Sequence, residues 1–461
     1  MRKIVFPVLA ALCLSYCQQA TDKSPSTDMP QTESIHPRSF STPEYVKDGI
    51  IYEVNIRQYT PEGTFDAFQK HLPRLRELGV KVLWLMPIHP IGKKNRKGEL
   101  GSYYAVRDYY GINPEFGTKE DFQRLVDEVH KLGMYLIIDW VPNHTAWDNP
   151  LTEEKPDFYL KDINGDFVPP VGTDWDDVIA LDYSNEQLRA YMKDAMLYWV
   201  EEFDIDGYRC DVAGYVPTDF WREVRYELDQ RKEVFMLAEW EERVMHQAFD
   251  MSYAWELEET MVKVVDSEKG GAIMHDYLAR MYNVWSLDQI KMNHTTNHDK
   301  NSWEGTVFER FGKAAETFAV LTYLVEGMPL LYSGQEVGLA RPLAFFEKDS
   351  IAWGDHPFNA LYARLGKLKA DNPALWSGSW GGRVQLATTT KPQRVLAFRR
   401  QKDENEIVAF FNLTDQRNDF SVEKGIREGE YKSFVSKSRL PYESGQELSL
   451  GPWGYEVWIR N

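Results

Sequence analysis

The chain has 461 residues, of which 43% are hydrophobic and 27% are charged. This length exceeds one small domain, and this composition excludes a disordered or fibrous protein. Acidic residues outnumber basic residues by 71 to 53, a net charge of −18, which argues against nucleic acid as a partner because binding phosphates needs clustered positive charge.

The N-terminal segment has the pattern of an export signal. Arg2 and Lys3 precede an apolar run over 4–14 that is too short to span a bilayer as a mature helix. Residues 1–17 resemble a bacterial lipoprotein signal peptide, in which Cys17 would receive the lipid, although Tyr16 departs from the small residue usual before that cysteine. An ordinary export signal is the alternative. We predict an exported protein, anchored to a membrane by lipid at Cys17, in the periplasm or on the cell surface.

Residues 18–43 are rich in Ser, Thr, Pro, Asp and Gln, which is typical of a flexible tether. From residue 44 onward, short apolar runs alternate with stretches of helical spacing such as 64–79, 185–203 and 217–231. The apolar runs cover 50–59, 80–86, 134–141, 205–213, 234–240, 251–257, 290–298 and 328–333. Eight such runs within 44–377 predict an α/β fold, a TIM (β/α)8 barrel.

Two segments break this alternation. Residues 145–184 hold no long periodic segment and are too long for a plain connection, so we expect a small subdomain inserted after the third strand. Residues 378–461 show only short alternating runs, such as 395–398, 407–411 and 455–459. They predict a C-terminal all-β domain, a small antiparallel sandwich.

The carboxyl ends of the predicted strands carry charged residues. A TIM barrel places its active site at these ends, and burying charge inside a strand without partners is costly. The residues in question are Asp139 and His144, Arg209 and Asp211, Glu239, and His298 and Asp299. Carboxylates that meet in unlike environments are what glycoside hydrolysis needs, because one attacks while the other donates a proton.

These residues lie in recognisable motifs. The motifs are DWVPNH (139–144), GYRCDVA (207–213), MLAEW (236–240) and TNHD (296–299), with SYYAVRDY (102–109) and GMPLLYSGQE (327–336) beside them. In this order and spacing the chain is similar to the α-amylase family, glycoside hydrolase family 13, over roughly residues 44–461.

The resemblance implies a role for each carboxylate. Asp211 would be the nucleophile, Glu239 the general acid and then base, and Asp299 would hold hydroxyls of the distorted sugar ring. Arg209 lies two residues before Asp211, on the same side of the strand, so its charge would keep Asp211 ionised. Apolar neighbours of Glu239 would raise its pKa, as an acid catalyst requires. Asp139 would be a partner of Arg209 and not a reactant.

Other residues are implied to bind the substrate or a metal. Tyr104 would stack under the sugar, while His144 and His298 would bind sugar hydroxyls. Asn143 matches the family position for a structural Ca²⁺, although the chemistry itself needs no cofactor. The acidic loop 162–166 is either a Ca²⁺ loop or a turn, and the glycine within it favours the turn.

One departure from the family bears on the reaction. The family continues its nucleophile motif with a Lys-His pair, whereas Asp211 is followed here by Val212, Ala213 and Gly214. The leading interpretation is a retaining α-glucan hydrolase that cleaves α-1,4 bonds in starch-like polysaccharides or maltooligosaccharides. The alternatives are a transglycosidase or isomerase, of the glucanotransferase or trehalose synthase type, and a catalytically inactive carbohydrate-binding homologue. The oligomeric state is left open.

Overall fold

The computed structural model describes residues 40–460. The predicted signal peptide with Cys17, and the tether as far as residue 39, lie outside the described residues. Within them, no helix is long and apolar enough to cross a membrane.

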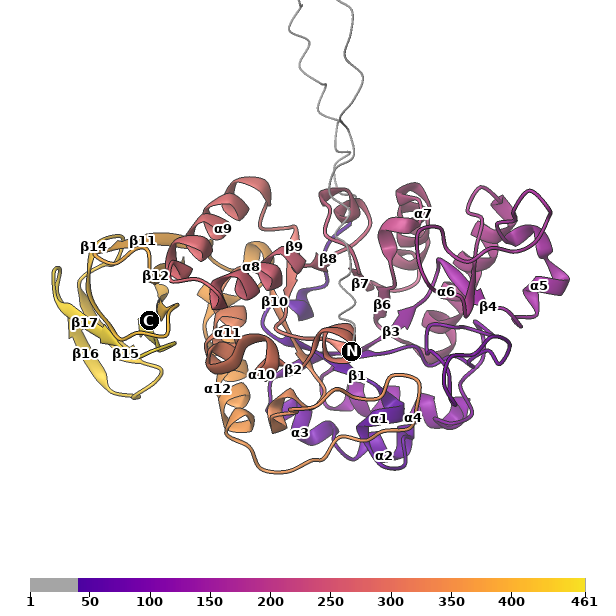
Figure 1. The fold of residues 1–461 in the computed structure, drawn as a ribbon, viewed down its shortest axis with the longest axis horizontal. Helices are drawn as coiled ribbons and strands as arrows, with labels where there is room; N and C mark the ends of the chain where they lie inside the picture. The colour runs from indigo at the N-terminus through magenta and orange to yellow at the C-terminus, as the bar shows by residue number, and fades with distance from the viewer. Residues whose placement is uncertain (1–39, 461) are drawn as a thin grey trace, which may run out of the picture. The chain divides into compact units, whose positions relative to one another are not determined.

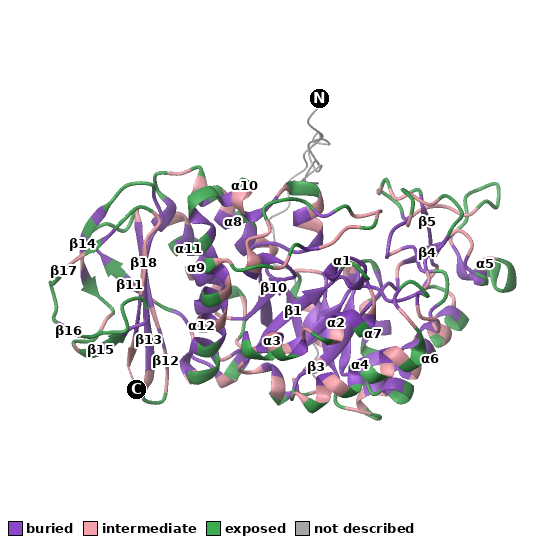
Figure 2. Ribbon diagram, turned by 90° about the horizontal axis from the view of Figure 1, so that it is seen from below, coloured by how far each residue is buried: buried purple, intermediate pink, exposed green. Residues whose placement is uncertain are grey.

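The core of the molecule is a closed barrel of eight parallel strands (Figure 1). The strands follow the order β1-β10-β9-β8-β7-β6-β3-β2 around the barrel. They are β1 (Ile50–Val54), β2 (Val80–Leu85), β3 (Tyr135–Trp140), β6 (Gly207–Cys210), β7 (Phe235–Ala238), β8 (Met251–Tyr253), β9 (Ile290–Asn293) and β10 (Met328–Tyr332). Each one lies within a predicted apolar run, so the predicted TIM barrel is confirmed. All eight strands are almost completely buried, as parallel strands covered by helices should be (Figure 2).

Helices cover the outside of the barrel. The main ones are α2 (Phe65–Gln69), α3 (Leu72–Glu77), α4 (Lys119–Lys131), α6 (Glu186–Phe203), α7 (Thr218–Asp229), α8 (Trp255–Val265), α9 (Gly270–Val284), α11 (Ala315–Leu324) and α12 (Pro357–Asp371). Thr118 and Asp121 form a reciprocal capping box at the start of α4, and the side chain of Asn185 caps α6. The predicted helix over 64–79 is two helices, and Pro73 stands in the first turn of the second.

The segment between β3 and α6 forms a small unit of its own. β4 (His144–Ala146) pairs antiparallel with β5 (Val178–Ala180), and the short helix α5 (Leu151–Glu154) lies between them in the chain. In the acidic loop, Asp162 Oδ1 accepts the backbone N–H groups of Asn164 and Asp166 at 2.8 and 2.9 Å. This geometry is that of a turn closed by its own side chain, which was the favoured interpretation of the loop.

The C-terminal domain is all-β and antiparallel, as predicted. Its strands follow the hydrogen-bonded order β16-β15-β18-β13-β12-β11-β14-β17, and side chains from all eight strands share one hydrophobic core. They are β11 (Gln385–Thr389), β12 (Val395–Lys402), β13 (Asn405–Asn412), β14 (Asn418–Lys424), β15 (Gly429–Ser433), β16 (Arg439–Tyr442), β17 (Glu447–Leu450) and β18 (Tyr455–Arg460). Arg400 of β12 is fully buried and donates to the backbone carbonyls of Leu324, Val325, Trp376 and Gly382.

One buried histidine lies just outside the barrel, beside β3. The ring of His89 is fully buried and lies 5.4–6.1 Å from the rings of Tyr109, Trp140 and Trp199. Neither ring nitrogen has a hydrogen-bond partner among residues 40–460. Burial among aromatic rings lowers the pKa of His89 to about 3, so the side chain is neutral in the folded protein.

Candidate active site

The charged residues meet because neighbouring parallel strands end at the same level. Asp139 of β3 pairs in register with Arg209 of β6, which in turn pairs with Leu237 of β7. Asp211 and Glu239 follow directly after β6 and β7, so both emerge at the same rim of the barrel. The structure therefore brings together the carboxylates that the sequence placed at separate strand ends.

Arg209 lies at the centre of this rim and is fully buried. Its Nη1 atom contacts Asp139 Oδ1 at 2.9 Å and Asp211 Oδ1 at 3.0 Å, while its Nη2 atom lies 2.9 Å from Glu239 Oε1. The other oxygen of Glu239 accepts the backbone N–H of Val212 at 2.7 Å. One guanidinium thus holds Asp211 and Glu239 side by side, each less than a tenth exposed.

Burial and Arg209 act in opposite directions on the two carboxyl groups. Burial raises the pKa of Asp211 to about 7, against the lowering effect of the Arg209 charge. Burial raises the pKa of Glu239 further, to about 8, and the charges of Asp211 and Asp299 add to the increase. The sequence predicts that the Arg209 charge keeps the pKa of Asp211 low. The structure contradicts this, because burial of the Asp211 carboxyl group has a larger effect than the Arg209 charge. Burial favours a proton on Glu239, as a general acid needs, and the Arg209 charge opposes the same effect at Asp211.

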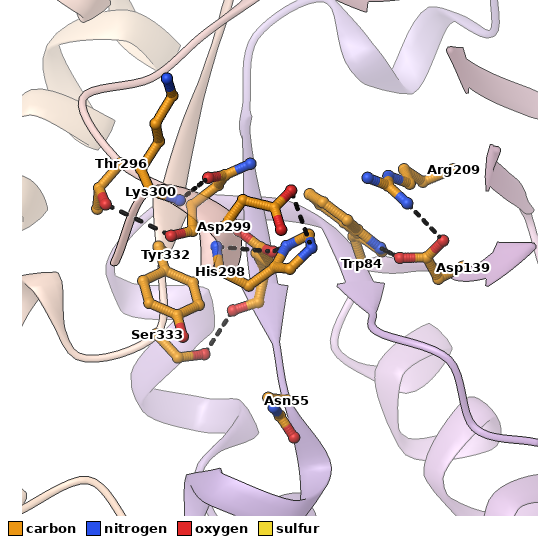
Figure 3. Close-up of polar contacts among 12 residues, drawn as sticks. Asn55, Trp84, Asp139, Arg209, Thr296, His298, Asp299, Lys300, Tyr332 and Ser333 are labelled. Carbon is orange, nitrogen blue, oxygen red and sulfur yellow. Dashed lines mark hydrogen bonds and ion pairs between the residues drawn. The ribbon is translucent and has the colours of Figure 1, made fainter. Parts of the chain in front are cut away.

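Asp139 is tied to the barrel wall on its other side. Its Oδ2 atom accepts a hydrogen bond from Trp84 Nε1 at 3.1 Å, and the Trp84 ring lies 4.9 Å from the Arg209 guanidinium (Figure 3). The same oxygen accepts a hydrogen bond from Tyr104 OH, also at 3.1 Å. Burial raises the pKa of Asp139 to about 6, opposed by Arg209 and His298. With every oxygen occupied by protein donors, Asp139 orients Arg209 and Tyr104.

A second group of hydrogen-bonded polar side chains reaches the site from β1 and from the segment after β9. His298 Nε2 lies 3.4 Å from Asp299 Oδ2 (Figure 3). The same nitrogen lies 2.8 Å from Tyr104 OH, and His298 Nδ1 lies 2.5 Å from Glu53 Oε1. Burial lowers the pKa of His298, but the carboxylates of Asp299 and Glu53 raise it to about 9. His298 is therefore a cation at neutral pH. The side chain of Asp299 is 44% exposed, so its carboxylate faces the open side of this cluster.

Tyr104 and His144 line the same region in different ways. The Tyr104 ring stacks on His298 at 5.5 Å and 21°, and on Phe345 at 6.4 Å and 11°. His144 lies at the start of the insert, where its ring is 5.5 Å from Trp175. Burial lowers the pKa of His144 to about 3, so it offers a neutral imidazole to a ligand.

Asn143, the predicted Ca²⁺ ligand, makes contacts with other protein groups. The backbone carbonyl of Asn143 accepts the N–H of Leu181, and its side-chain amide nitrogen lies 3.2 Å from His144 Nδ1. Ca²⁺ takes six to eight oxygen ligands, and residues 40–460 contain no group of three or more His, Cys, Asp or Glu side chains placed to hold a metal ion. In the insert, Lys97 Nζ contacts the carboxylates of Asp176 and Asp177 at 2.9 and 3.3 Å.

Three residues of this site were not predicted. Glu53 and Trp84 lie inside apolar strand runs, and Tyr253 of β8 accepts from Arg209 Nε at 3.2 Å. For Glu53 a signal was present, since it is the one charged residue in the buried strand Ile50–Val54. In the sequence, Trp84 and Tyr253 have the pattern of ordinary core residues. In the structure, Trp84 Nε1 and Tyr253 OH contact the site.

The departure from the family motif after Asp211 has a structural counterpart. Val212 adopts a left-handed conformation, with φ at 36°, and starts a short 3-10 helix over Ala213–Tyr215. A Cβ atom on Gly214 would lie 2.1 Å from the ring of Trp240, so only glycine leaves room for that ring. The space next to Glu239 is filled by aromatic side chains and not by a Lys-His pair.

Comparisons with known proteins agree with this geometry. The model of the α-amylase catalytic domain matches residues 34–167 and 173–411. The α-amylase MalA of Haloarcula japonica is 27% identical over 86% of this chain, which spans 60% of that protein. The maltogenic α-amylase of Bacillus acidopullulyticus is 23% identical, with 89% and 77% of the two chains covered.

Solved structures are similar over nearly the whole chain. A noncanonic maltogenic α-amylase, AmyB from Thermotoga neapolitana, is 31% identical with a TM-score of 0.82, covering 90% of this chain and 98% of that one. An α-amylase from Lactobacillus plantarum is 31% identical with a TM-score of 0.80, covering 89% and 98%. The chain belongs to the α-amylase family, glycoside hydrolase family 13, and is a glycoside hydrolase.

Proposed function

We propose that the protein is a retaining α-glucan hydrolase that cleaves α-1,4 bonds in starch-like polysaccharides or maltooligosaccharides. The relatives are named as α-amylases and maltogenic amylases, which supports an α-glucan as the substrate class. The observation that carries the proposal is the single guanidinium that contacts both Asp211 and Glu239 in a buried site, where burial raises the pKa of each carboxyl group.

The first step uses both carboxyl groups. Asp211, as the carboxylate, attacks the anomeric carbon, and Glu239 donates its proton to the glycosidic oxygen as the bond to the leaving sugar breaks. The glycosyl group is then an ester on Asp211, and Glu239 is a carboxylate. Asp299 and the His298 cation hold the sugar hydroxyls, and the Tyr104 ring covers the apolar face of the sugar.

The second step reverses the proton transfer. Water attacks the anomeric carbon, Glu239 takes the proton of that water, and the bond to Asp211 breaks. Both displacements occur at the same carbon, so the product keeps the α-configuration. Arg209 contacts both carboxyl groups and stabilises whichever of them is charged at each stage.

The test compares substrates that differ in their leaving group. We expect Glu239→Gln to lower kcat on maltotriose at least about 100-fold, because it removes the general acid. The same variant keeps its first step on α-maltosyl fluoride, since fluoride leaves without a proton. Asp211→Asn loses activity on both substrates. Glu242→Gln, an exposed neighbour, serves as the control. Equal losses for Glu239→Gln on both substrates would contradict its role as the acid.

Retention is tested separately. Proton NMR of the first maltotriose hydrolysis products should show the α-anomer appearing before mutarotation. An initial β-anomer would refute a glycosyl ester on Asp211, because a single displacement by water inverts the configuration.

A second candidate function shares the first step. If a sugar hydroxyl in place of water attacked the ester, the enzyme would be a transglycosidase or, when the leaving sugar re-attacks, an isomerase. The aromatic side chains that fill the space beside Glu239 favour a bound sugar there. Chromatography of maltotriose digests separates the outcomes, since products longer than the substrate appear only on transfer.

We also propose that the protein is exported and held at a membrane by lipid on Cys17. The support is the pattern of residues 1–17. In a bacterial host, the full chain should fractionate with membranes and the Cys17→Ser variant should not. Equal membrane fractions for both would contradict lipid attachment at Cys17.

A further inference from the structure

A buried ion pair lies behind the segment that follows Glu239. The Nζ atom of Lys291, on β9, lies 3.0 Å from Glu241 Oε1 and 3.2 Å from Ser252 Oγ. The side chains of Lys291 and Glu241 are only 11% and 13% exposed, and the Lys291 Nζ atom lies 3.9 Å from the centroid of the Trp285 ring. Burying a Lys–Glu pair costs solvation that the attraction between the charges repays at best, so stability alone does not explain this pair.

Glu241 joins three elements of the fold. Its Oε2 atom accepts the backbone N–H of Glu256, in the first turn of α8, at 2.8 Å. The N-cap residue of α8 is Ala254, which has no side-chain oxygen, so Glu241 caps this helix from a distant segment. Lys291 pairs in register with Ser252 of β8. The Glu241 carboxylate therefore ties the segment after β7 to α8 directly and to β8 and β9 through Lys291.

The proton on Glu239 weakens the contacts that otherwise hold this side chain. Glu239 Oε1 lies 2.9 Å from Arg209 Nη2, and Glu239 Oε2 accepts the backbone N–H of Val212 at 2.7 Å. Both contacts are strongest when Glu239 is a carboxylate, because an ionised acceptor makes shorter and stronger hydrogen bonds. As the general acid Glu239 carries a proton, so the position of its side chain depends more on its main chain. That main chain is held at Trp240, whose carbonyl accepts the N–H of Tyr253 at 3.0 Å.

We propose that the ion pair of Lys291 and Glu241 positions Glu239 for proton donation in the first step. The inference rests on the proposed function and deepens it by naming two positioning residues. Glu241 lies two residues after Glu239, so fixing its side chain between β9 and α8 fixes the end of the segment that carries the acid. Without the Lys291 charge, the Glu241 carboxylate would be buried without a compensating charge and would move toward water, together with the main chain of 239–241. Both residues act through that main chain and not by contact with the reacting atoms.

The experiment compares two substrates that differ in their need for the acid, with the full-length enzyme. Cleavage of maltotriose needs the proton of Glu239, whereas α-maltosyl fluoride releases fluoride without it. The quantity compared is kcat/KM, which reports the steps up to formation of the glycosyl ester and is independent of the second step. Assays at pH 7 keep Lys291 charged, because burial lowers its pKa only to about 8. Glu239→Gln gives the pattern expected for complete loss of the acid.

Three variants alter the pair and one serves as the control. Lys291→Met removes the charge and keeps the length of the side chain, whereas Lys291→Arg keeps the charge. Glu241→Gln removes the charge of the partner but keeps an oxygen for the N–H of Glu256. Lys232→Met is the matched control, because it breaks an ion pair of 2.9 Å with Asp206, which directly precedes β6 at the end of the barrel opposite the active site.

We expect Lys291→Met and Glu241→Gln to lower kcat/KM at least about tenfold on maltotriose but less than about threefold on the fluoride, because a displaced acid slows only the reaction that needs a proton. Lys291→Arg and Lys232→Met should stay within about threefold of the wild type on both substrates, because each keeps the positive charge beside Glu241. Equal losses on the two substrates in Lys291→Met, or an unchanged value on maltotriose, would overturn the proposal. If Lys291→Met does not fold, Glu241→Gln is judged by the same two outcomes. A wild-type enzyme that is inactive on both substrates would instead contradict the proposed function.

Discussion

Replacing His89 with leucine should make the protein more resistant to acid. The ring is fully buried among aromatic side chains and has no partner for either nitrogen among residues 40–460. Leucine has a similar volume and no polar atom, so at pH 8 we expect the free energy of unfolding to stay the same or increase.

The size of the effect follows from the pKa of His89. Burial lowers it from 6.5 to about 3, so the unfolded chain binds a proton at mildly acidic pH while the folded protein does not. Stability from this group is therefore complete above pH 6.5 and is lost as the pH falls toward 3. Between pH 8 and pH 5 the loss is about 2 kcal/mol, at 1.36 kcal/mol per pH unit over about 1.5 units.

The assay is urea unfolding, followed by tryptophan fluorescence at pH 8 and pH 5. Other titrating groups act equally in both proteins, so the wild-type enzyme should lose about 2 kcal/mol more than His89→Leu between the two pH values. His275→Gln, which alters a histidine on the surface of α9, is the control and should match the wild type. Equal losses for His89→Leu and the wild type would refute the reasoning.

Four further results are expected. The kcat/KM on maltotriose should rise with pH through about 7, as Asp211 loses its proton, and fall above about 8, as Glu239 does; an optimum near pH 5 would show that burial does not raise the two pKa values. Asp139→Asn should lower the free energy of unfolding by about 3 kcal/mol in urea, because it breaks a buried ion pair; a loss below about 1 kcal/mol would show that the pair is not needed. Tyr104→Phe keeps the ring but removes a hydroxyl bonded to a charged group, so kcat/KM should fall about tenfold, and an unchanged value would make the hydroxyl dispensable. EDTA should leave the melting temperature unchanged, and a drop of several degrees reversed by Ca²⁺ would show that Asn143 does belong to a metal site.

The barrel could be predicted because its signals are local. Each strand is a short apolar run, and Asp211 and Glu239 follow their strands directly, so strand order and residue spacing were enough to place these two residues at one rim. The capping box at Thr118 is also a local feature, since both partners lie within one helical turn. The carboxyl ends of the parallel strands lie on one face of the barrel, so residues from separate motifs meet in one site.

The remaining features depend on contacts between distant segments. Glu53 and His298 are 245 residues apart in the chain. The sequence around each residue therefore does not indicate that the two side chains are in contact. The pKa of Asp211 depends on how deeply the folded protein buries it, which the adjacent arginine alone does not reveal. Pairing among the C-terminal strands is likewise non-local, so alternating runs predicted an antiparallel domain without showing the order in which its strands pair.

The buried arginine of β12 limits how this enzyme can be redesigned. The Arg400 guanidinium donates hydrogen bonds to the backbone carbonyls of Leu324 and Val325, at the end of α11. It also donates to those of Trp376 and Gly382, which lie before β11. A graft that exchanged residues 378–461 for another module would leave those oxygens unsatisfied within an apolar seam. Chimeras should therefore be joined after the end of β13 at Asn412, next to residue 411, where the match to the catalytic-domain model ends.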